Sequence, residues 1–139
     1  MRFMVFVKLT GKTAADYEAG AMPEPDDLAT MMKFNEELVN AGVMVDGQGF
    51  QATVKGARVK FGSGKPVVTD GPFAESKELL GGYWIWNVNS KEEAVEWASK
   101  APMAEGDVLE LRQIFEMEDF GPEVAAQEAA LFERMEKGA

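Results

Sequence analysis

Two segments of the chain are apolar at almost every position, so their strands would present large side chains on both faces. The first is FMVFV, residues 3–7, and the second is YWIWNV, residues 83–88. Successive side chains of a strand point to opposite faces of its sheet. Both segments therefore predict central strands of a sheet that must be covered on both faces.

Three other segments have the spacing of helices. The first is expected to begin near Asp26 and to end at Gly42, a residue typical of the position after a helix. The second opens with the capping box SKEE, residues 90–93, and ends before a proline. The third, residues 122–139, predicts a helical extension that follows a domain of residues 1–121.

The remaining segments predict strands. Residues 43–54 predict a strand with a bulge or bend at Gly47 and Gly49, and residues 57–71 predict a hairpin around the turn GSGK. The last strand is VLELRQIFE, residues 108–116. The order is thus that of a ferredoxin-like, split βαβ fold of the α+β class with an antiparallel sheet and an added C-terminal helix.

In that fold both helices cover one face of the sheet and leave the other face open. The two strands that are apolar on both faces would expose aromatic residues to water in a monomer, which invites aggregation. We therefore expect a second copy to cover the open face, giving a homodimer through the sheet face and a dimeric α/β barrel.

Composition narrows the classes of function. The 139 residues fit one domain, and no apolar run approaches the ~20 residues that span a bilayer. The net charge of −10, from 24 acidic and 14 basic side chains, makes nucleic acid and anionic membranes unfavourable partners. The N-terminus lacks the features of a signal peptide, so a cytoplasmic location is expected.

The chain contains neither cysteine nor histidine. This excludes disulfides, thiolate nucleophiles, thiolate zinc sites and histidine-based acid–base catalysis. No cofactor and no metal site are expected. Any catalysis must use carboxylates, lysine, tyrosine, arginine or hydroxyl groups.

The candidate chemistry lies in TDGPFAESKELLGGYWIW, residues 69–86, where charged residues precede the second two-faced strand. With polar and apolar positions of the first helix, they are expected to border a small apolar cleft between sheet and helix. Local alternatives are a hydrogen-bonded turn at the aspartate and a solvated charged loop after it. The candidate ligand-binding residues are Asp70, Glu75, Lys77, Tyr83, Met31 and Asn35, and the first three are also the candidate catalytic residues.

Two further features of the sequence have alternative interpretations. Gly81 and Gly82 predict either a strand bulge or a close approach of a ligand to the backbone. Arg58 and Arg112 fall on predicted strands, where an inward side chain would pair with a carboxylate such as Asp46 or would bind an anionic ligand.

One motif carries a resemblance to a known family. The sequence DGPF, residues 70–73, is followed by Glu75, Lys77 and then Gly-Tyr-Trp. With FNEELVNAGVMVDGQGF and KGARVKF, it resembles the YCII-related, or DGPF-domain, family of small bacterial proteins over nearly all of residues 1–121. The resemblance implies a ferredoxin-like α+β fold, dimerisation through the sheet, a cytoplasmic protein and a largely unassigned function.

The wider YCII-related group is similar in architecture to muconolactone isomerases and is suspected of an enzymatic activity that uses a histidine on the first helix with a nearby aspartate. In this chain the corresponding position falls near Met31, and Asp70 stands in the matching motif. Three functions stay open: a dimer that binds a small organic molecule, a histidine-free isomerase or lyase that uses carboxylate proton transfer, and a structural or regulatory accessory dimer.

Overall fold

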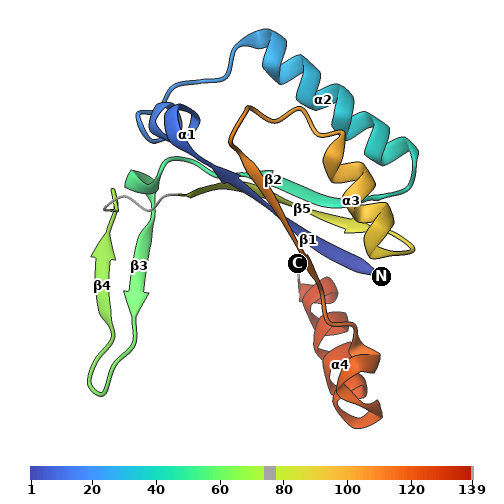
Figure 1. Ribbon diagram of the computed structural model, residues 1–139. Coiled ribbons are helices and arrows are strands. Elements are labelled where there is room, and N and C mark those ends of the chain that lie inside the picture. The colour runs from blue at the N-terminus through green and yellow to red at the C-terminus, as the bar shows by residue number, and fades with distance from the viewer. Residues whose placement is uncertain (74–77, 139) are drawn as a thin grey trace.

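The computed structural model describes residues 1–73 and 78–138 and has the predicted ferredoxin-like α+β fold (Figure 1). Its main sheet is antiparallel, with strands in the order β2-β5-β1-β6. These strands are β1 (Arg2–Leu9), β2 (Met44–Gly49), β5 (Leu79–Asn87) and β6 (Val108–Gln113). No helix in the described part of the chain combines the length and apolarity needed to cross a membrane.

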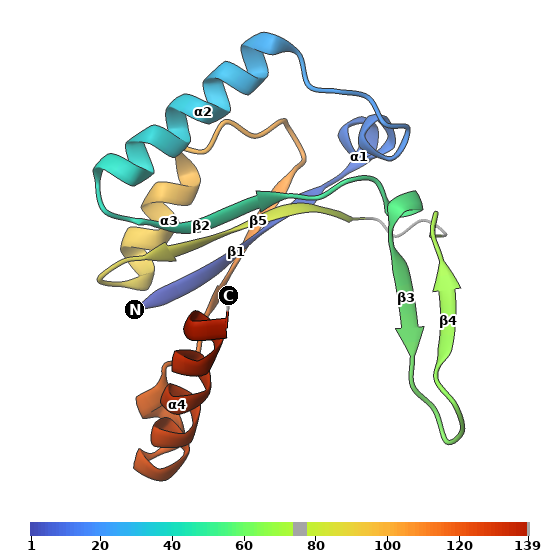
Figure 2. The same cartoon turned by 180° about the vertical axis from the view of Figure 1, so that it is seen from behind.

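Helices α2 (Pro25–Asn40) and α3 (Lys91–Ser99) cover one face of this sheet. Two arms extend from opposite ends of the sheet toward its other side (Figures 1 and 2). One arm is the hairpin of β3 (Ala57–Lys60) and β4 (Val67–Asp70), and the other is helix α4 (Pro122–Gly138). The short elements are α1 (Gly11–Glu18) and the single turns η1 (Thr53–Lys55) and η2 (Met117–Phe120).

Local sequence explains where the two covering helices begin and end. Helix α2 starts with a proline, carries Asp26 and Asp27 in its first turn and is followed by Gly42 at φ 73°. At α3, the Ser90 hydroxyl accepts the N–H of Glu93 at 3.1 Å. The predicted capping residue is therefore confirmed.

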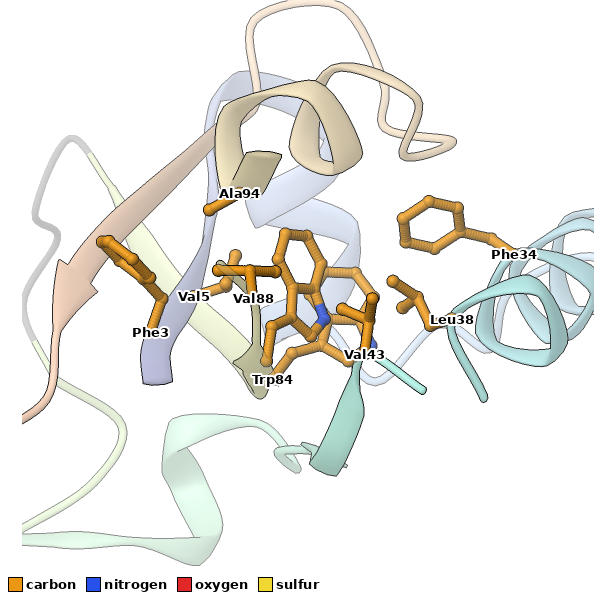
Figure 3. Packing of buried hydrophobic residues seen from close by; sticks show 9 residues of the cluster. Phe3, Val5, Phe34, Leu38, Val43, Trp84, Val88 and Ala94 are labelled. Atoms are coloured by element: carbon orange, nitrogen blue, oxygen red, sulfur yellow. The ribbon is translucent and has the colours of Figure 1, made fainter. Parts of the chain in front are cut away.

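The core is an aromatic layer between the helices and the sheet (Figure 3). Phe34 of α2 lies edge-on to Trp84 of β5, with ring centroids 5.7 Å apart, and edge-on to Trp86 at 6.4 Å. Among the described residues the indole N–H of Trp86 has no hydrogen-bond acceptor, whereas that of Trp84 donates to Asn35 Oδ1 at 2.9 Å. The buried members are Phe3, Val5, Phe34, Leu38, Val43, Trp84, Trp86, Val88 and Ala94.

The pairing of β1 with β5 contains the predicted glycine bulge. Val7 pairs with Gly82 and Lys8 with Leu80, which leaves Gly81 without a partner on β1. A Cβ at Gly81 would lie 2.8 Å from Leu9 Cδ1, so a larger residue here would have to displace the Leu9 side chain. The bulge reading of the Gly81-Gly82 pair is thus confirmed.

Strand β2 also has a bulge, but not at the glycines that were expected to cause it. The register shift falls between Met44 and Asp46. Gly47 has another role: a Cβ there would lie 2.9 Å from Trp84 Cδ1. The glycine therefore lets the indole of Trp84 lie directly on the backbone of β2.

Arg112 pairs with a carboxylate as expected, but its partner is Glu110 rather than Asp46, and Arg58 forms no ion pair with another described residue. The guanidinium of Arg58 lies 3.9 Å from the ring centroid of Phe73, and Arg112 Nη1 lies 3.6 Å from Glu110 Oε2. Topology separates the partners, because Arg58 belongs to the hairpin outside the main sheet and Arg112 to the edge strand opposite β2. Asp46 Oδ2 instead accepts the hydroxyl of Tyr83 at 2.7 Å.

Leu38→Ala tests whether α2 is anchored as described. Leu38 is fully buried, so we expect the free energy of unfolding to fall by about 2–5 kcal/mol. The same truncation at Leu28 of α2, which is 44% exposed, is expected to cost about 1 kcal/mol or less. Urea unfolding of both variants measures the difference, and equal losses would contradict the assigned face of the helix.

Candidate functional site

A cavity of about 900 Å³ lies between the sheet, α2 and the segment that joins α1 to α2. Strand β5 contributes Gly81–Trp84, β2 and the following loop contribute Gly47–Ala52, and α1 with its connection contributes Tyr17–Pro23. Helix α2 lines the cavity on the side opposite the sheet. The site thus joins residues from the N-terminal third and the centre of the chain.

Most of the cavity wall is apolar. Leu28 and Met31 face it from α2, and Val7, Met44 and Trp84 face it from the sheet. Methionine side chains are flexible and polarisable, so they adapt to ligands of different outline. Such a wall suits the apolar body of a small organic molecule.

Glycine at one end of β2 leaves part of the cavity unfilled. Gly49 lines the cavity and pairs with Gly82, on the same face of the sheet as Trp84. A Cβ at Gly49 would meet no atom of the described residues within 4 Å. A larger side chain can therefore be placed here without a clash, and it would occupy cavity volume.

Asn35 supplies a defined polar group in this wall. Its Oδ1 accepts the indole N–H of Trp84, which fixes the orientation of the amide. Its Nδ2 makes no hydrogen bond to another described residue. The two Nδ2 hydrogens are therefore available to an acceptor on a bound molecule.

Tyr17 and Glu18 line the cavity from α1. The Tyr17 hydroxyl donates to the carbonyl of the bulged Gly81 at 3.0 Å. Burial raises the pKa of Tyr17 above its ordinary value, although the backbone N–H of Phe50 opposes the shift. Tyr17 therefore stays neutral at physiological pH and acts as a donor.

The carboxylate of Glu18 is held by a single residue of η1. It accepts the hydroxyl of Thr53 at 2.5 Å and the backbone N–H of Thr53 at 2.8 Å. These two bonds, the hydroxyl first, hold the pKa of Glu18 below its ordinary value. Glu18 is therefore an anchor for η1, ionised over the neutral range.

The same threonine supports the DGPF turn. Phe73 N–H donates to Thr53 Oγ1 at 3.3 Å, and Gly71 N–H donates to the carbonyl of Gly56 at 3.0 Å. A Cβ at Gly71 would lie 1.7 Å from the carbonyl oxygen of Thr53, so no other residue fits this turn. Within the described residues, the motif seats the base of the hairpin on η1.

The six residues predicted from sequence are not all brought together. Met31, Asn35 and Tyr83 line the cavity. Asp70 ends β4, is exposed and lies outside the lining. Glu75 and Lys77 fall outside the described residues.

Tyr83 presents its phenol to the other side of the sheet. Strand alternation places it on the face opposite Trp84, where its hydroxyl bonds to Asp46. That bond raises the pKa of Tyr83 and, together with the backbone N–H of Gly47, lowers the pKa of Asp46. The pair therefore keeps its proton on the phenol.

Sequence reasoning missed Tyr17, Glu18, Gly49 and Lys55 as lining residues. Tyr17 had a usable signal, because it is the single aromatic residue between positions 11 and 33 and lies in a short helical turn. Glu18 had none. Its partner Thr53 is 35 positions away, in a segment that was expected to be a strand.

No group of three or more acidic side chains in residues 1–73 and 78–138 is placed to hold a metal ion. A family model described as YCII-related domain matches residues 1–118 of the chain. No curated protein matches it in sequence.

Thr53→Val tests the anchor. Removing the hydroxyl is expected to raise the pKa of Glu18 toward its ordinary value of 4.5, with the bond from the backbone N–H retained. A carboxyl whose pKa is lowered by folding stabilises the folded state above its ordinary pKa, and this contribution is lost as the pH falls through the folded-state pKa. The variant should therefore lose less stability on acidification.

NMR titration of the Glu18 side-chain carbon measures the shift. Thr30→Val is the matched control, because the Thr30 hydroxyl bonds within α2 to the carbonyl of Asp26. An unchanged Glu18 titration in Thr53→Val would show that the hydroxyl does not hold the carboxylate.

Proposed function

The chain belongs to the YCII-related domain family, and we propose that it is a dimer that binds a small organic molecule in the cavity between α2 and the sheet. The observation that carries the proposal is the cavity itself. Its volume of about 900 Å³ lies within the range typical of ligand sites, and its wall is mostly apolar with a few oriented polar groups.

The lining favours a particular kind of molecule. Met31, Met44 and Trp84 match an apolar or aromatic body, and the Nδ2 of Asn35 matches a carbonyl or other acceptor on it. Lys55 lies exposed at the lining and makes no ion pair with another described residue. Its ammonium would attract an anionic group on the ligand.

Binding has more support than the alternative of a histidine-free isomerase or lyase. Proton transfer at neutral pH is most efficient from a group whose pKa lies near 7. In the cavity wall the pKa of Glu18 is lowered and that of Tyr17 is raised, so both move away from neutrality. Their hydrogen bonds to Thr53 and Gly81 suit anchoring rather than turnover.

The open face of the sheet supports the dimer. Met4, Phe6 and Ile85 share this face and are half-buried, with the helices on the far side of the sheet. Lys8 and Glu110 form an ion pair beside them, with 2.7 Å between Nζ and Oε1. An apolar centre with a charged rim is the usual anatomy of a protein interface.

Gly49→Val tests the cavity. A panel of small aromatic carboxylates is screened against the wild type by ligand-observed NMR. The valine is expected to fill part of the cavity, so it should abolish binding of the compounds that bind the wild type. Gly62→Val is the matched control, since a Cβ at Gly62 in the hairpin turn also meets no described atom within 4 Å. Equal binding by both variants would place the ligand elsewhere.

Asn35→Asp makes the same test more specific. The aspartate can still accept the Trp84 indole N–H but has no Nδ2 hydrogens, so carboxylate hits should bind at least about tenfold more weakly, a loss of ~1.4 kcal/mol. Undiminished binding would remove Asn35 from the site.

Sedimentation velocity at micromolar concentration tests the dimer. We expect the wild type to sediment as a dimer and Ile85→Lys to sediment as a monomer, because the lysine puts a charge in the apolar centre of the open face. Val39→Lys, at a 59% exposed position of α2, should stay dimeric. A monomeric wild type would refute the proposed dimer.

A further inference from the structure

The β3–β4 hairpin needs cover that its own chain does not give in the described structure. Every residue of both strands is exposed. Val59 and Val68 pair across the hairpin and so share a face, and they are 51% and 63% exposed. Phe61, two positions after Val59, is 78% exposed. An isolated two-stranded hairpin is at best marginally stable in water, so a partner surface is expected.

This arm is predominantly basic. Residues 55–70 contain four cationic side chains and one carboxylate, Asp70 at the end of β4. Arg58 stacks on Phe73. None of the four forms an ion pair with another described residue. The cations are Lys55, Arg58, Lys60 and Lys65.

Helix α4 has the complementary character. Val124, Leu131 and Met135 recur at helical spacing on one side and are 45%, 53% and 58% exposed. The helix packs against η2 and stands away from the sheet (Figures 1 and 2). The described residues of its own chain therefore leave about half of this apolar side exposed.

This second arm is acidic. Residues 116–138, which include all of α4, contain seven carboxylates and two cations. Glu128, four positions after Val124 and three before Leu131, lies beside the apolar side of the helix. Neither Glu128 nor Glu136 forms an ion pair with another described residue. The two uncovered arms thus carry opposite charge.

The arms extend to the same side of the sheet from its opposite ends, so they do not cover each other within one chain (Figures 1 and 2). In a two-fold dimer through the open faces, each hairpin meets either the partner's hairpin or the partner's α4, depending on the direction of the axis. The first arrangement brings basic arms together. The second brings a basic apolar arm against an acidic apolar one, which is electrostatically favourable.

We propose that each hairpin packs against α4 of a second copy, so that two equivalent hairpin–helix contacts flank the sheet interface. A two-fold axis makes the exchange reciprocal. This inference rests on the proposed dimer and adds its orientation. The partner that covers both the hairpin and α4 is thus a second copy of this chain.

Charge reversal tests the pairing. The hairpin variant is Lys60→Glu with Lys65→Glu, and the helix variant is Glu128→Lys with Glu136→Lys. Each should raise the dimer dissociation constant at least about tenfold at low salt, because two attractive contacts per dimer become repulsive. The control, Glu36→Lys with Glu37→Lys on the exposed side of α2, makes the same charge change as the helix variant and should leave the constant within about threefold.

Two recombinations make the test specific. A chain with all four arm substitutions should dimerise like the wild type. A mixture of the hairpin variant and the helix variant should form a heterodimer as stable as the wild-type dimer, because both of its contacts again join opposite charges. Circular dichroism verifies that each variant is folded, and the mixture reports on pairing even if one homodimer is lost.

The outcomes separate the two proposals. A monomeric wild type overturns the dimer and this inference with it. A wild-type dimer that neither reversal weakens overturns the hairpin–helix pairing and leaves the sheet dimer standing, as expected if the hairpins meet each other or if a different protein covers the arms. Rescue in the four-substitution chain without rescue in the mixture would place the contact within one chain and would also overturn the pairing.

Discussion

The hydrogen bond from the Trp84 indole to Asn35 is the contact on which both the fold and the cavity depend. It joins β5 to α2 across the aromatic core, where Phe34 lies edge-on to the same indole. A buried indole N–H without an acceptor is costly, so the bond favours the position of α2 that places Asn35 over the sheet. Gly47 makes this possible, because a side chain there would collide with the ring. Once Trp84 and Asn35 are fixed, they form a wall of the cavity.

The part of the cavity wall formed by α1 and the end of β2 depends on a second constraint, the bulge at Gly81. The bulge leaves Gly81 out of the β1 register, and its carbonyl accepts the N–H of Phe50 at 2.9 Å and the hydroxyl of Tyr17. These bonds join the end of β2 and helix α1 to the middle of the sheet. The space stays open because Gly49, beside them, has no side chain to fill it. The cavity is thus a result of backbone irregularity and missing side chains more than of any motif.

Because the cavity depends on backbone irregularity, the sequence predicts the fold better than it predicts the cavity. Element order, the α+β class and the caps at Gly42 and Ser90 depend on local pattern, and they were predicted correctly. Met31 and Asn35, which line the cavity, were named as candidates because the helical spacing of α2 is regular. The bonds of Tyr17 to Gly81 and of Glu18 to Thr53 span 64 and 35 positions, and no local pattern encodes them. Arg112 pairs with a carboxylate as expected, but Asp46 was not recognised as out of its reach for the same reason, since that separation depends on strand order.

The DGPF turn, residues 70–73, links the cavity wall to the β3–β4 hairpin. The motif suggested a ligand-binding or catalytic site. In the described residues, however, Gly71 packs closely on Thr53, and Phe73 lies under the guanidinium of Arg58. Thr53 also binds Glu18 at the edge of the cavity. One turn of 3₁₀ helix therefore supports both the cavity wall and the base of the basic arm. A substitution at Thr53 or Glu18 acts on both regions, so an effect on ligand binding at these positions is not by itself evidence of contact with the ligand.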